Sequence, residues 1–353
     1  MNLNEVEKIA EAVLYEGYML YPYRPSAVKN QQRWNFGVLY PPSYCAGQTG
    51  SETSAMQTEC LLKATPTTRL TVKVRFLEVV RRSIGRLRTP GKQEPEGVQP
   101  DLVLVDRLSV AGRVYLPWEE VFEREKTFTD LDPESLAGRP PALFTFPAGK
   151  SFEYLCDEQG QAVGVVVREW ETLEGSVQLS SEPLRDGVAK VSVRVNNGTR
   201  FDPHEPMERS GRSEALRYSL VSAHTILGVE NGEFISLIEF PPDLANLAAR
   251  CNNIGTWPVL AGDGANTILS SPIILYDNPQ IAPESAGNLY DSTEIDEILS
   301  LRILTLTDEE KREMRESDDR TREILERTEN MPPEQLMKLH GALRGLAPVG
   351  EKM

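Results

Sequence analysis

The sequence contains no apolar run of about 18 residues, the length that a membrane-spanning helix needs. It also lacks the basic region and apolar core of a secretory signal, because its first residues, MNLNEVEKIAEAVLYEG, are acidic and amphipathic. The apolar residues of this segment recur at helical spacing, so we expect a short helix here. Together these features predict a cytoplasmic protein without a membrane span.

Cysteine and histidine, which hold zinc and iron–sulfur clusters in proteins, are scarce. The chain has four cysteines and three histidines, and no two cysteines form a C-x-x-C pair. We therefore expect Cys45, Cys60, Cys156 and Cys251 to be free thiols, with a Cys45–Cys60 bridge as the alternative. No cofactor is predicted.

Positive charge is also in deficit, since 38 Lys and Arg residues oppose 53 Asp and Glu residues and give a net charge of -15. This balance disfavours nucleic acid as a general partner. The exception is the stretch from Lys63 to Lys92, which has nine Lys or Arg residues and one acid, Glu78. RNA binding by this stretch is one alternative. We favour pairing with the acidic segment 284–329, in the same chain or in a second copy, which is compatible with a homo-oligomer.

Several segments within the first 290 residues have apolar residues at every second position or read as strands. Leu70, Val72, Val74 and Phe76 alternate with polar residues, which is typical of a half-buried strand. Segment 150–170 reads as two strands joined at DEQGQ, and 189–197 as another strand. Segment 217–244 predicts a hairpin, with Asn231-Gly232 supplying the positive φ of a tight turn.

The chain becomes helical after residue 290. Asp291 with Glu294, and Thr307 with Glu310, match the spacing of a capping box at a helix start. We expect one helix after each box, the second running to about Glu329, and a short helix after Pro332-Pro333.

The predicted fold class is therefore α+β, mainly antiparallel β as a sandwich or open barrel with a C-terminal helical segment. The predicted domains are a β-rich body with a short N-terminal helix at 1–290 and a helical segment at 291–353. A sub-boundary near 90–100 is the alternative, because Pro and Gly interrupt the pattern there.

Two constellations suit an enzyme. Cys251 and His224 could form a nucleophile–base pair, with an asparagine as orienter, in a hydrolase or transferase. His204, Asp202 and Glu205 lie close together in sequence and are competent metal ligands. A core position for His224 and a solvated loop at 202–208 explain the same residues without chemistry, so we expect a protein that is not an enzyme.

The segment from Leu14 to Pro42 is rich in aromatic and basic residues. Two prolines disfavour a central strand at 22–25, so its basic part is expected in a connection. Tyr, Trp and Arg dominate the energetics of protein interfaces. The predicted binding residues are Tyr23, Arg24, Lys29, Asn30, Arg33 and Trp34.

Several long stretches resemble an uncharacterised bacterial family encoded in the gene clusters of uptake-type [NiFe]-hydrogenases. They include LYEGYMLYPYRPSAVKNQQRWNFGVLYP, SLVSAHTILGVENGEFISL, CNNIGTWPVLAG, LSSPIILYDNPQIAPESAGNLYDSTEIDEILSLRILTLTDEEKREMR and LHGALRG. The resemblance implies a non-catalytic cytoplasmic accessory protein for hydrogenase assembly, maturation or complex formation. Its expected partner is a hydrogenase subunit or a fellow accessory protein, met through protein–protein contacts.

Overall fold

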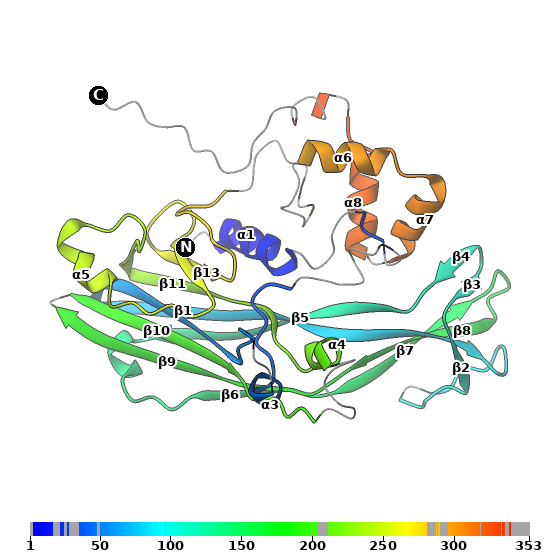
Figure 1. Cartoon of the computed structure of the whole chain (residues 1–353), viewed down its shortest axis with the longest axis horizontal. Helices are drawn as coiled ribbons and strands as arrows, with labels where there is room; N and C mark the ends of the chain where they lie inside the picture. Colours follow the sequence, from blue (N-terminus) through cyan, green and yellow to red (C-terminus); the bar gives the residue numbers. More distant parts are fainter. Residues whose placement is uncertain are drawn as a thin grey trace.

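One large antiparallel sheet, folded over on itself, forms the body of the protein, and helices cover one side of it (Figure 1). The computed structural model describes residues 3–16, 22–24, 27, 35–47, 50–95, 97–185, 187–202, 211–280, 287, 289, 296–317, 319–332, 334–335 and 339. The predicted fold class, mainly antiparallel β with C-terminal helices, is confirmed, and the sheet is open rather than closed into a barrel.

Strand β1 (Ala55–Leu87) is the longest element and pairs with five other strands. Those neighbours are β2 (Leu102–Val105), β5 (Trp118–Leu131), β8 (Ala162–Trp170), β10 (Val188–Asn197) and β11 (Val221–Ile235). The alternation predicted for β1 is confirmed, because Leu70, Val72, Val74 and Phe76 are all buried in one core cluster. Strand β7 (Gly149–Cys156) joins β8 across DEQGQ, as predicted.

Strands β1 and β11 bend together at a shared corner. Their pairing register slips between Ala64 and Arg69, and there the hydroxyls of Thr65 and Thr68 donate to the carbonyl of Asn231 over 2.9 and 2.7 Å. Asn231 has a φ of 54°, which the corner requires. The predicted hairpin at Asn231-Gly232 is therefore wrong, because both sides of this turn pair with β1 and not with each other.

The corner brings the two halves of β1 face to face. Thr58, before the corner, has its hydroxyl 3.1 Å from that of Thr225, which pairs with Val74 beyond the corner. The first half of β1 thus carries β10, β9 (Leu173–Arg185) and β6 (Ala142–Phe146) as a second layer under β11, β1 and β5 (Figure 1). The main core fills the space between the layers, including Phe76 against Phe144.

The remaining elements extend or cap this body. They are β3 (Leu108–Val110), β4 (Arg113–Tyr115), β12 (Trp257–Leu260), β13 (Thr267–Ser271), α3 (Pro42–Ala46), α4 (Gly211–Leu216), α5 (Ala245–Ala248), η1 (Pro133–Leu136) and η2 (Pro242–Leu244). The hairpin of β3 and β4 turns at Ala111 and Gly112, both with positive φ, and packs against helix α7 (Asp308–Ser317).

Helices α1 (Leu3–Tyr15), α6 (Asp296–Leu304), α7 and α8 (Asp319–Glu329) lie on the outer side of the upper layer (Figure 1). The N-terminal helix is confirmed. The sequence pattern predicted one helix after Thr307, running to about Glu329, where the structure has two, α7 and α8. The capping box at Thr307 is confirmed, since Glu310 accepts from the Thr307 backbone over 2.8 Å and Thr307 accepts in return over 3.3 Å. The box predicted at Asp291 lies outside the described residues.

A second core cluster fixes the C-terminal helices on the body. Leu299, Met314 and Leu325 are fully buried, and they belong to one cluster with Leu77 of β1 and Tyr15 of α1. The helical segment is therefore packed onto the sheet and is not a free tail. Within the described part of the chain, no helix is both long and apolar enough to cross a bilayer.

Candidate functional site: an arginine-lined cleft

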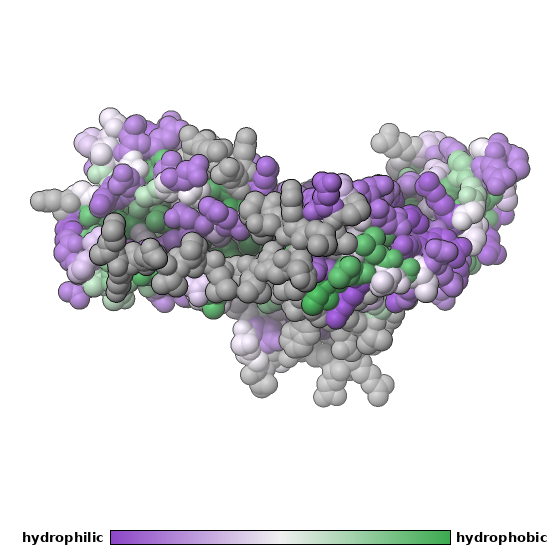
Figure 2. Space-filling model, turned by 90° about the horizontal axis from the view of Figure 1, so that it is seen from above, coloured by the Kyte–Doolittle hydropathy of each residue, from purple (hydrophilic) through white to green (hydrophobic). Residues whose placement is uncertain are grey.

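A cleft of about 670 Å³ lies where the C-terminal helices meet the sheet. Strands β1, β4, β5, β7 and β8 form one wall, and helices α7 and α8 form the other. Its charged lining residues are Arg82, Arg113, Arg168, Arg312, Arg315, Arg320 and Arg322 together with Glu120, Glu153, Glu316, Asp319 and Glu326. Viewed from the helix side, hydrophilic residues cover most of this end of the molecule (Figure 2).

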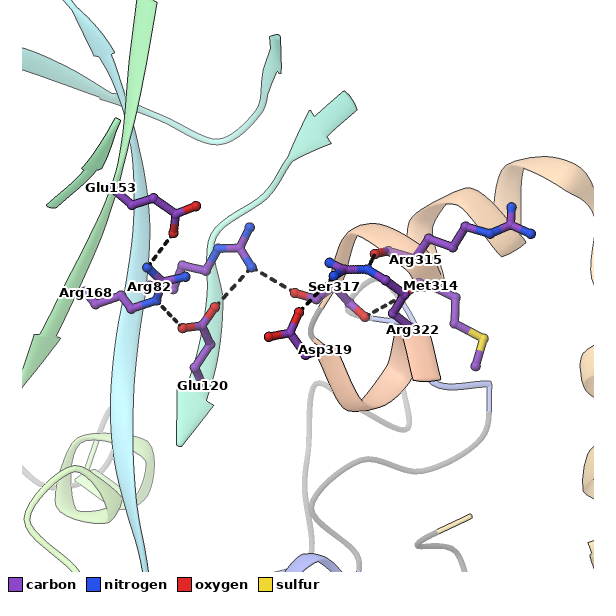
Figure 3. Close-up of polar contacts among 9 residues, drawn as sticks. All are labelled: Arg82, Glu120, Glu153, Arg168, Met314, Arg315, Ser317, Asp319 and Arg322. Carbon is purple, nitrogen blue, oxygen red and sulfur yellow. Dashed lines mark hydrogen bonds and ion pairs between the residues drawn. The ribbon is translucent and has the colours of Figure 1, made fainter. Parts of the chain in front are cut away.

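Arg82 of β1 reaches across from the sheet to the helices (Figure 3). Its side chain is 7% exposed, and its Nη1 donates to Glu120 over 3.1 Å and to the carbonyl of Ser317 over 2.8 Å. Ser317 ends α7, where carbonyls have no partner within the helix and the helix dipole is negative. Arg82 therefore holds the end of α7 on the sheet, while its Nε has no hydrogen-bond partner.

Glu120 of β5 bridges two arginines. One of its carboxylate oxygens accepts from Arg82, and the other accepts from Arg168 Nε over 2.5 Å. Arg168 also donates to Glu153 over 2.7 Å. Burial alone would lower the pKa of Arg168, but the hydrogen bonds to Glu120 and Glu153 outweigh it and raise the pKa. The sheet wall of the cleft thus carries fixed positive charge that is held in place by its own carboxylates.

The helix wall has its own ion pairs. Arg322 donates to Asp319 over 2.9 Å and to the carbonyl of Arg315 over 3.0 Å (Figure 3), and Arg320 donates to Glu123 over 2.8 Å.

Four charged residues of the lining have no ionic partner among the described residues. They are Arg113, Arg312, Glu316 and Glu326. Arg113 and Arg312 are exposed and come from opposite walls, β4 and α7. These two cations are available to a ligand.

Two of the residues predicted to bind a partner are engaged within the protein. Tyr23 is fully buried and its hydroxyl donates to the carbonyl of Leu289 over 2.6 Å. Arg24 forms ion pairs with Glu310 over 3.1 Å and with Glu313 over 3.9 Å. In this structure Tyr23 ties the N-terminal region to Leu289, and Arg24 ties it to helix α7. The other predicted residues, Lys29, Asn30, Arg33 and Trp34, lie outside the described part of the chain.

Cys251 and His224 do not meet. Thr225 faces the space between the layers, so its neighbour His224 faces outward, towards α1. Cys251 packs with Leu61 on the outer side of the other layer. The two stacked layers, about 10 Å apart, stand between them, which is beyond hydrogen-bond reach.

Their environments also disfavour a reactive pair. Burial lowers the pKa of His224 to about 4, while its Nδ1 bonds to the carbonyl of Ser222 over 2.9 Å. Burial, with a smaller contribution from Glu59, raises the pKa of Cys251 to about 11, so the thiol stays protonated at neutral pH. This arrangement therefore does not support the dyad considered from the sequence.

The described residues do not test the predicted metal site. His204 and Glu205 lie outside the described residues, and Asp202 is exposed. No group of three or more histidine, cysteine, aspartate or glutamate residues suited to a metal occurs in the part of the chain that the structure describes.

The basic stretch of β1 finds its partners close by. Lys73 pairs with Glu7 of α1 over 2.6 Å, and Arg75 pairs with Glu123 of β5 over 3.1 Å. Within one chain, the expectation that segment 284–329 supplies these acids is wrong for the described residues, because every carboxylate paired with the stretch precedes residue 284. They are Glu7, Glu94, Asp101, Glu120, Glu123, Glu125 and Asp130. Pairing with a second copy stays a prediction.

No local sequence pattern predicted the cleft. Arg82 belongs to the basic stretch from Lys63 to Lys92, but its neighbours on the helices are more than 200 residues away in sequence. No protein-family model matches the chain, and a search of curated proteins finds no relative of it.

Proposed function

We propose that this protein is a non-catalytic accessory protein that acts by protein–protein contacts, and that the arginine-lined cleft binds an acidic segment of its partner. The observation that carries the proposal is the set of seven arginines around one cleft, with two of them, Arg113 and Arg312, unpaired in the described structure. Arginine is among the residue types that dominate interface energetics, and its planar fork suits carboxylates.

The charge distribution supports an anionic segment. The whole protein carries a net charge of -15, yet the charged residues of the cleft comprise seven arginines and five acids. A negatively charged chain is therefore repelled by most of the surface and attracted locally, which favours one binding position over many. An open cleft about 670 Å³ in volume has room for a short extended segment.

The partner is proposed from the family resemblance. A hydrogenase subunit or a fellow accessory protein in the cytoplasm fits a protein that works through a binding cleft. The helical wall, which Arg82 and Arg24 hold on the body, would keep the cleft in shape for that partner.

The test is affinity purification from the native host, with mass spectrometry of the proteins that accompany the chain. Arg113→Gln/Arg312→Gln protein should lose most of the partner, because both unpaired cations are removed. Arg139→Gln/Arg200→Gln protein is the matched control, since both arginines are exposed, outside the cleft and without ion pairs in the described structure. Equal recovery by the two variants would refute the assignment of the cleft.

A further inference from the structure

The floor of the cleft contains a donor that the protein itself does not use. Arg82 is more than nine-tenths buried, and only its Nη1 is engaged, by Glu120 and the Ser317 carbonyl. Nε has no partner, and none of the described groups bonds to Nη2. In a guanidinium group Nε and Nη2 lie on the same side and point in parallel, so one complete fork of Arg82 has no partner in the described structure.

Three carboxylates of the cleft are already engaged in the observed arrangement. Both oxygens of Glu120 are already taken, one by Arg82 Nη1 and one by Arg168. Asp319 is paired with Arg322 on the helix side, and Glu153 is paired with Arg168. An oxyanion of a ligand could accept the two hydrogen bonds that Arg82 Nε and Nη2 do not make within the protein.

A second feature favours an anion at the same place. Helix α8 has eleven residues and begins at Asp319, which lines the cleft beside Ser317, the residue that Arg82 binds. The first N–H groups of a helix have no partner within it, and the dipole is positive there. The start of α8 and Arg82 therefore line the same cleft.

We propose that this floor is a carboxylate-binding subsite, in which Arg82 Nε and Nη2 hold both oxygens of one Asp or Glu side chain of the partner's acidic segment. The inference rests on the proposed function and names the group that the cleft recognises. A carboxylate is favoured over a phosphate because Glu120, Glu153 and Asp319 line the same cleft and would repel a dianion. A planar monoanion with two oxygens matches the fork without further cations.

The experiment is calorimetric titration of the whole protein at low salt with acetylated, amidated hexaglutamate. Hexaglutamine of the same form is the neutral control. Hexaglutamate should bind and hexaglutamine should not, and about 300 mM salt should weaken the binding. Absence of hexaglutamate binding overturns the proposal.

Two variants locate the subsite. Arg82→Lys keeps the charge but removes the fork, so hexaglutamate should bind about tenfold more weakly. Because Arg82 also holds α7, the circular dichroism spectrum and the unfolding curve of the Arg82→Lys protein must match those of the wild type. If the Arg82→Lys protein does not match the wild type, Asp319→Asn is the test variant. The exposed carboxylate of Asp319 repels the ligand, so its removal should tighten hexaglutamate binding about threefold. Unchanged affinity in a folded Arg82→Lys protein, or in Asp319→Asn where that serves, overturns the subsite.

Inorganic phosphate separates the two anion chemistries. It should not displace hexaglutamate at about tenfold excess, and competitive displacement would identify a phosphate site instead. The outcome for the subsite is independent of the partner assay. Peptide binding could depend on Arg82 while partner recovery is unaffected by Arg113→Gln/Arg312→Gln. That combination would refute the proposed function and support the carboxylate site.

Discussion

Replacing Arg82 by methionine should destabilise the protein, whereas the same change at its neighbour Arg81 should not. Both arginines lie on β1, but Arg81 is exposed and has no ion pair in the described structure, while Arg82 is buried between the sheet and α7. Methionine keeps most of the apolar stem of either side chain, so the comparison isolates the guanidinium group.

The magnitude follows from the two bonds of Arg82. Each is a hydrogen bond from a charged donor, worth about 1.5–3 kcal/mol net. The loss is limited at Glu120, because Arg168 still neutralises that carboxylate. The loss is larger at Ser317, because its buried carbonyl loses a hydrogen-bond partner. We expect the free energy of unfolding to fall by about 3 kcal/mol for Arg82→Met, and by less than about 0.5 kcal/mol for Arg81→Met.

Urea unfolding followed by circular dichroism measures both values, provided that the slope against urea is unchanged. Hydrogen exchange adds a local readout. Amides near the end of α7 and the start of α8 should exchange faster in Arg82→Met, because these are the elements that Arg82 fixes to the sheet. Equal loss of stability in the two variants, or unchanged exchange in the helices, would show that the arginine does not hold the helical wall.

Four further predictions concern the fold around the site. His224 has a pKa of about 4 in the folded protein and 6.5 in the unfolded chain, so the free energy of unfolding should fall by about 3 kcal/mol as the pH drops from 6.5 to 4. In urea unfolding, the His224→Asn protein should lack this part of the decline. Arg124→Met should lower the free energy of unfolding in urea by about 3–5 kcal/mol, because burial raises the pKa of Glu78 and Arg124 is its charged partner. Adding Glu78→Gln to the same chain should recover much of that loss, and additive effects would contradict the pairing. Thermal unfolding should show little change for Asn231→Gly but a loss of about 1–2 kcal/mol for Asn231→Val, since a β-branched residue is strained at a φ of 54°. Thr307→Ala should lower stability by about 1 kcal/mol in the same assay through loss of the helix cap, and a neutral result would show that α7 does not need it.

Local patterns in the sequence were sufficient for some of the strands and helices. The alternation of Val191, Val193 and Val195 predicted β10, and the box at Thr307 predicted where α7 begins. Both signals depend on neighbouring residues only, so they survive without knowledge of the fold. Asn231-Gly232 was correctly read as a position that needs a positive φ, but a hairpin and a corner need it equally.

The candidate site depended on contacts that no local pattern contains. Arg82 and Ser317 are 235 positions apart, and nothing in either segment marks the other as its partner. Pairing of the basic stretch was expected with the acidic segment 284–329, yet it occurs with β5 and α1, because strand register places Glu123 opposite Leu77 and beside Arg75. Net charge along a segment does not reveal such register.

The sequence by itself determined a β-rich body with a helical C-terminal segment, because the periods of two and 3.6 residues appear directly in the order of apolar residues. Only the tertiary structure decided that β1 folds back at its corner, that His224 and Cys251 lie on opposite sides of the layers, and that seven arginines line one cleft. The physical reason is that each of these facts depends on strand pairing and side-chain packing between distant segments, which the fold alone brings together.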